Sequence, residues 1–147
     1  MNIKKEYPEQ NYPLKDLTEK IIAAAFKVHN TLGSGFMEKV YENALAEELR
    51  LQGYNVDQQK ELSVNYNGKS VGDFRVDLIV NGLVIVEIKA VKVFEKSFED
   101  KLLNYLKTTK YMVRLIINFA EKVYIKRKVN SDAKSSASTS AASAQSL

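Results

Sequence analysis

A charged pair interrupts one of the most apolar stretches of the sequence. Residues 83–90 read Leu-Val-Ile-Val-Glu-Ile-Lys-Ala, so Glu87 and Lys89 stand two residues apart in a run that predicts a buried strand. Because successive side chains of a strand point to opposite faces, Glu87 and Lys89 share a face. Desolvating two charges is costly unless they pair or bind a metal ion. The run therefore predicts either a surface ion pair at a strand end or part of a metal site.

A second carboxylate, Asp77, belongs to the strand that precedes this run. The turn signal Asn-Gly at 81–82 separates the two strands, so the hairpin brings Asp77 back towards Glu87. Two carboxylates that face each other repel, which calls for a compensating cation. Oxygen ligands suit Mg²⁺ or Mn²⁺, and a lysine beside the metal can orient an attacking water and offset charge on a phosphate.

The length of the turn decides whether this site can exist. A strict two-residue turn leaves Asp77 and Glu87 on opposite faces of the sheet. A three-residue loop, with Gly82 in the left-handed conformation, pairs Val80 with Val84 and sets Asp77 opposite Glu87. We therefore predict the three-residue loop or an equivalent one-residue irregularity.

Glu38 is a third candidate carboxylate. It follows the Gly-Ser-Gly segment 33–35, at the start of a helix predicted from 37 to 52. Spacing alone leaves two interpretations open, because an acidic residue near a helix N-terminus is favourable without any metal. Glu38 either stabilises the helix start or completes the ligand set.

The remaining periodicities predict an α+β domain. Helical spacing occurs at 16–32, 37–52 and 97–109, and strands are expected at 61–66, 71–80, 83–91, 112–119 and 123–129. We expect helices flanking a mainly antiparallel or mixed central sheet in the order ααββββαββ, which counts one more strand before the third helix than these ranges delimit.

The composition fits one domain with two polar flanks. A chain of 147 residues with 45% hydrophobic residues can build one core. We expect an extended lead-in over 1–13, the domain over 14–130, and a disordered tail over 131–147, which is rich in Ser and Ala.

Charge and cysteine content bound the partners and the compartment. The chain has no cysteine, which excludes disulfides and thiolate metal sites and favours a cytoplasmic location. No stretch approaches the roughly 18 apolar residues of a membrane span, so no membrane association is expected. The net charge of +4 weakly favours an anionic partner such as nucleic acid.

The motifs coincide with a known pattern. Gly35-Phe-Met-Glu38-Lys-Val-Tyr41 matches the G-x-x-E-x-x-Y signature of the GxxExxY proteins. Together with Arg75-Val-Asp77, Val86-Glu-Ile-Lys89 and Ile117-Asn-Phe119, it makes the chain resemble that family from about Leu14 to Val129.

GxxExxY proteins are grouped with the PD-(D/E)XK (restriction-endonuclease-like) nuclease superfamily. The resemblance implies that Glu38, Asp77 and Glu87 bind metal with the backbone carbonyl of Ile88, and that Lys89 is the catalytic lysine. It further implies a nuclease dependent on Mg²⁺ or Mn²⁺ that hydrolyses phosphodiester bonds of nucleic acid, DNA first. A homodimer stays open as the assembly state.

One position departs from the pattern of related nucleases, which carry a Q-x-x-x-Y helix after the E-x-K strand. Here that helix reads Lys101-Leu-Leu-Asn-Tyr105. Lysine keeps a donor for a phosphate but loses the acceptor of glutamine. We expect Lys101 and Tyr105 to bind substrate, although Tyr105 fits a core position equally well. The departure keeps an alternative open, a weakly active or inactive nuclease-fold module that binds nucleic acid or a protein.

Two further features favour structural interpretations. His29, the only histidine, is expected to make a structural or helix-capping hydrogen bond rather than to act as a base. The lysine-rich segment 122–128 is interpreted as an edge strand protected by charge, with phosphate contacts as the alternative.

Overall fold

The computed structural model describes residues 14–93, 95–107 and 109–129, so the expected lead-in and tail lie outside the described residues. The elements are α1 (Lys15–Leu32), α2 (Glu38–Leu51), β1 (Val56–Tyr66), β2 (Lys69–Val80), β3 (Val84–Lys89), α3 (Lys96–Lys107), β4 (Val113–Phe119) and β5 (Val123–Val129). The α+β class is confirmed. The order is ααβββαββ, one strand fewer than expected, because the single strand β1 fills the stretch between α2 and the turn at residues 67–68.

The five strands form one mixed sheet in the order β1-β2-β3-β4-β5. All neighbours are antiparallel except β3 and β4, which run parallel with Glu87 opposite Ile116 and Lys89 opposite Asn118. A parallel pair needs a crossover connection, and α3 provides it. The carboxyl ends of β3 and β4 therefore lie at the same edge of the sheet.

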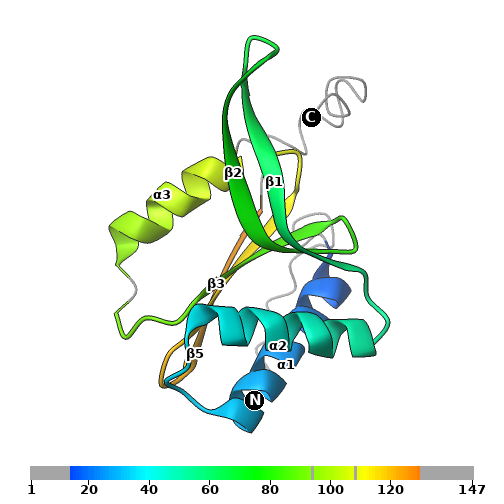
Figure 1. The fold of residues 1–147 in the computed structure, drawn as a ribbon, viewed down its shortest axis with the longest axis vertical. Helices are drawn as coiled ribbons and strands as arrows, with labels where there is room; N and C mark the ends of the chain where they lie inside the picture. The colour runs from blue at the N-terminus through cyan, green and yellow to red at the C-terminus, as the bar shows by residue number, and fades with distance from the viewer. Residues whose placement is uncertain (1–13, 94, 108, 130–147) are drawn as a thin grey trace.

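Helices α1 and α2 cover one face of the sheet and enclose the main core (Figure 1). Their apolar residues recur at helical spacing, and Ile21, Leu45 and Leu49 are fully buried. Alternate residues of β3 join this core, which comprises Val84, Val86 and Ile88 on that strand. The intervening residues of β3, including Glu87, consequently point away from the main core.

Helix α3 lies apart from α1 and α2 (Figure 1). Arg114 on β4 donates a hydrogen bond from Nη1 to the carbonyl of Leu103 at 2.9 Å, and Lys126 on β5 lies 3.6 Å from Glu99. The β1–β2 hairpin extends beyond the rest of the sheet as an arm (Figure 1). None of the helices within the described ranges is both long and apolar enough to span a membrane.

Candidate active site

The β2–β3 hairpin has the predicted parity. Val80 pairs with Val84, which leaves the three-residue loop 81–83 between them. Gly82 adopts the predicted left-handed conformation with φ 64°, and Asn81 also has a positive φ of 53°. The Asn81 side chain ties this loop to the residue just before β1, because its Oδ1 accepts a hydrogen bond from the Asn55 backbone N–H at 2.9 Å.

Asp77 and Glu87 meet where β2 separates from β3. The paired register of these strands ends at Leu78 and Val86, so the next two residues lie at the opening of a fork. The Asp77 N–H donates to Glu87 Oε1 at 3.2 Å, and the Ile88 N–H donates to Asp77 Oδ2 at 2.7 Å. The two carboxyl groups thus replace the strand-to-strand hydrogen bonds that the fork has opened.

Burial gives Glu87 an unusual acidity. Glu87 is only 6% exposed. This desolvation, reinforced by the negative charge of Asp77, raises the pKa of Glu87 to about 9. The positive charge of Lys89 opposes this shift but is a smaller influence. Without a cation, Glu87 therefore carries a proton at neutral pH.

Glu38 and Lys89 form the second contact of the site. Glu38 is the first residue of α2, and its Oε1 lies 3.9 Å from Lys89 Nζ. The Glu38 side chain is 47% exposed and that of Lys89 is 19% exposed. Such a partly exposed pair contributes little to stability, about 0–1 kcal/mol. The Glu38 carboxylate lies at a helix start and beside Lys89, and no described hydrogen bond or ion pair joins it to Asp77 or Glu87.

The donor set fits a divalent cation in its chemistry. Asp77 and Glu87 supply carboxylate oxygens, and Ile88 holds the adjacent backbone in place because its side chain is fully buried in the main core. Oxygen donors of this kind are those that Mg²⁺ and Mn²⁺ prefer. Within residues 14–129, positions 94 and 108 aside, no three acidic or histidine side chains converge as a ready metal cage. Glu38 faces Lys89 instead.

Two residues that the sequence patterns did not single out complete the arrangement. Gln59 donates hydrogen bonds from Nε2 to Asp77 Oδ1 at 3.0 Å and to Glu42 Oε1 at 2.8 Å. Glu42 is 3% exposed and also accepts hydrogen bonds from Gln58 at 2.8 Å and Lys39 at 3.1 Å. A continuous chain of contacts therefore joins α2 to the candidate ligand Asp77.

Gln59 reaches Asp77 because the backbone of β1 is irregular at this point. Its φ is 54°, a left-handed conformation that is rare for a residue with a side chain. Pairing resumes on either side, at Gln58 with Leu78 and at Lys60 with Val76. Backbone strain of this kind persists where surrounding contacts hold it and is frequent at functional sites.

The sequence contained a signal for only one of these two residues. Glu42 follows Glu38 by four residues, which places both acids on one side of a helix. Gln59 gives no comparable signal, because a local change of backbone conformation inside a strand leaves the alternation of residue types intact.

The two residues expected on α3 are not joined to the other four. Lys101 is exposed, and among the described residues no hydrogen bond or ion pair links it to Glu38, Asp77, Glu87 or Lys89. Tyr105 belongs to α3, but its side chain lies outside the described part of the structure.

His29 has the structural hydrogen bond that was expected of it. Its Nε2 lies 2.9 Å from the carbonyl oxygen of Ala120, and its own carbonyl accepts the Gly33 N–H at 2.7 Å beyond the end of α1. The ring also stacks on Phe119, with a centroid distance of 6.4 Å. His29 thereby ties α1 to the turn between β4 and β5.

Comparisons with known proteins identify the superfamily of this chain. A family model described as the PD-(D/E)XK nuclease superfamily matches residues 15–130, well over half of the chain. Neither the curated proteins nor the solved structures gave a match. The matched range contains both hairpin carboxylates, the lysine beside them and the first residue of α2, and the chain belongs to the PD-(D/E)XK nuclease superfamily.

Proposed function

We propose that this protein is a Mg²⁺- or Mn²⁺-dependent nuclease of the GxxExxY type that hydrolyses phosphodiester bonds of nucleic acid, with DNA as the first candidate. The observation that carries the proposal is the contact between Asp77 and the buried Glu87 beside Lys89. Two carboxyl groups this close repel each other when both are ionised, and a divalent cation relieves that repulsion when it displaces the proton.

Asp77, Glu87 and the backbone carbonyl of Ile88 would hold the ion, with Glu38 supporting the site from α2. When bound, the ion would supply Lewis acidity and neutralise charge at the phosphoryl oxygen. Lys89 then has a role of its own, since its ammonium group can donate a hydrogen bond to a phosphate oxygen or orient a water. Glu38 pairs with this ammonium group from the first turn of α2.

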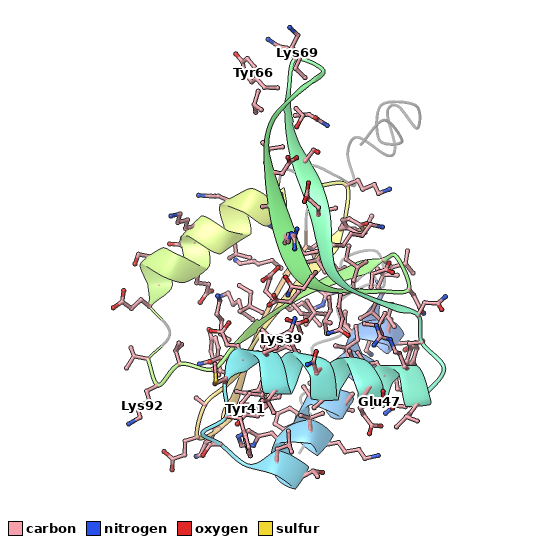
Figure 2. All side chains as sticks on the ribbon, in the orientation of Figure 1. Lys39, Tyr41, Glu47, Tyr66, Lys69 and Lys92 are labelled. Carbon is pink, nitrogen blue, oxygen red and sulfur yellow. The ribbon has the colours of Figure 1, made fainter. Side chains whose placement is uncertain are left out.

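Cleavage assays test the proposal directly. Single-stranded and double-stranded DNA and RNA are incubated with the protein and Mg²⁺ or Mn²⁺. We expect Asp77→Ala and Lys89→Ala each to reduce cleavage by at least about 100-fold, and Glu38→Gln to have a smaller effect. Glu47→Gln is the matched control, because Glu47 is an exposed acid towards the other end of α2 (Figure 2). Activity that survives Asp77→Ala or Lys89→Ala contradicts the assigned roles.

A second candidate is a nuclease-fold module with little or no turnover that binds nucleic acid or a protein. The position of Lys101 favours it, because this replacement for the glutamine of related nucleases is exposed and makes no described contact with the four residues. Titration with Mn²⁺ in a calorimeter separates the candidates. A nuclease binds the ion and loses that binding in Asp77→Ala, whereas an inactive module binds it weakly or not at all.

A further inference from the structure

A cleft of about 1360 Å³ opens at the edge of the sheet where the parallel strands β3 and β4 end. One wall is the loop that leads into α2, at Gly35 and Phe36. The floor is formed by residues 90–93, directly after Lys89, and the opposite wall by residues 118–122 and Tyr124. Along the chain, the lining begins at Ala90, the residue after Lys89, and includes Phe36, two residues before Glu38.

Both walls and the floor of the cleft are held in place by hydrogen bonds. The Tyr41 hydroxyl donates to the Gly33 carbonyl at 2.6 Å and accepts the Phe36 N–H at 3.3 Å. The side-chain amide of Asn118, which is 3% exposed, bonds both the N–H and the carbonyl of Val91, at 3.0 and 2.9 Å. The hydrogen bond of His29 holds the remaining wall at Ala120. The cleft is thus a preformed feature of the fold.

The lining combines aromatic surface with positive charge. Phe36 and Tyr124 come from opposite walls, and each is 44% exposed. Lys92 and Lys122 are exposed, and neither has an ion-pair partner in the described part of the chain. Aromatic rings that stack on bases, together with cations that contact phosphates, characterise sites for single-stranded nucleic acid.

We propose that this cleft binds unpaired nucleotides of the strand that is cut, so that the substrate is single-stranded or has a single-stranded end. The proposal rests on the proposed nuclease function and specifies its substrate. Bases of an intact duplex are stacked on one another and expose only their edges in the grooves, so they cannot stack on Phe36 or Tyr124. The phosphates of the strand would contact Lys92 and Lys122 in the cleft and would extend towards Lys89.

The binding test uses the full chain without divalent cations, so that no cleavage occurs. Fluorescence anisotropy measures binding of a labelled twelve-nucleotide oligo(dT) and of a duplex hairpin of equal charge. Loss of one stacked base at about 1 kcal/mol corresponds to about 5-fold, so we expect Phe36→Ala and Tyr124→Ala each to weaken oligo(dT) binding at least that much. Tyr124→Phe should restore it, because phenylalanine keeps the stacking face.

The control for Phe36→Ala is Phe26→Ala, since Phe26 on α1 is also 44% exposed but lies outside the cleft. Charge gives a test with opposite signs. Lys92→Glu should weaken binding, whereas Glu121→Gln should strengthen it, because Glu121 is the acidic residue of the lining. Lys69→Glu is the matched lysine control, because Lys69 lies at the tip of the β1–β2 arm, far from Lys92 (Figure 2).

The results separate this proposal from the nuclease assignment. Unchanged oligo(dT) binding in folded Phe36→Ala and Tyr124→Ala overturns the cleft proposal, even if cleavage still depends on Asp77. Equal binding of the hairpin with the same losses in the variants also overturns it and indicates a duplex site. If the cleft variants weaken oligo(dT) binding but the protein cleaves no substrate, the cleft proposal is supported and the nuclease proposal is contradicted. Melting temperatures show which variants are folded.

Discussion

The side-chain amide of Gln59 donates a hydrogen bond to Asp77 Oδ1 at 3.0 Å. Gln59 itself lies in a strand with a left-handed backbone, at a φ of 54°. The same nitrogen reaches Glu42 on α2, so the orientation of Asp77 depends on both a helix and a strained strand. In metal sites, residues that orient a ligand are often nearly as important as the ligand itself. This contact therefore leads to the first prediction.

Replacement of Gln59 by leucine should weaken metal binding without abolishing the fold. Gln59→Leu keeps a side chain of similar length but removes the donor to Asp77, and we expect Mn²⁺ affinity to fall about 10-fold or more in calorimetric titration. Gln58→Leu is the matched control, because Gln58 bonds Glu42 and Asn43 but not Asp77. Equal losses in the two variants would show that Asp77 gains nothing from Gln59.

Glu87→Gln should stabilise the metal-free protein at neutral and alkaline pH. Since the pKa of Glu87 is raised to about 9 in the folded state, its contribution to stability is complete below its ordinary pKa of 4.5 and is lost as the pH rises towards 9. Glutamine stays neutral throughout this range. We expect the stability of the variant relative to the natural protein to grow by at most about 1.4 kcal/mol per pH unit.

Thermal unfolding in a chelator between pH 5 and 8.5 measures this difference. Glu47→Gln, which changes an exposed acid, should show no such trend. A difference between Glu87→Gln and the natural protein that stays constant with pH would mean that Glu87 is already ionised in the fold. The same variant should lose Mn²⁺ binding, because an amide cannot replace the carboxylate charge.

Metal binding should become stronger as the pH rises from 6 to 8. The ion must displace the proton that burial and Asp77 keep on Glu87, so its apparent affinity increases up to about 10-fold per pH unit while the pH stays below about 9. Calorimetry in two buffers of different ionisation enthalpy at pH 7 should show release of about one proton per ion. Binding without proton release would contradict the raised pKa of Glu87.

Tyr41→Phe should loosen the loop before α2. Tyr41 is fully buried, and its hydroxyl bonds both Gly33 and Phe36, so removal leaves the Gly33 carbonyl and the Phe36 N–H without this partner. We expect a loss of about 1–3 kcal/mol in the free energy of unfolding, measured with denaturant. Tyr66→Phe at the exposed tip of the β1–β2 arm should have almost no effect (Figure 2).

The sequence by itself determined the local features of the site. Alternation in β3 put Glu87 and Lys89 on one side, and the Asn-Gly turn with one further residue set the register that brings Asp77 to Glu87. Both follow from periodicity within a few residues, which short-range sterics and turn chemistry specify. The α+β class was predictable for the same reason, although the expected fourth strand before α3 is absent from the described residues.

Only the tertiary structure decided how the distant residues meet. Glu38 faces Lys89 rather than the two carboxyl groups, and Gln59 and Glu42 brace Asp77 through a left-handed residue inside β1. The cleft likewise combines three loops that are far apart in the chain. These relationships depend on how α2 packs across the sheet and on where β2 leaves β3, and packing between distant elements has no periodic signature in the sequence.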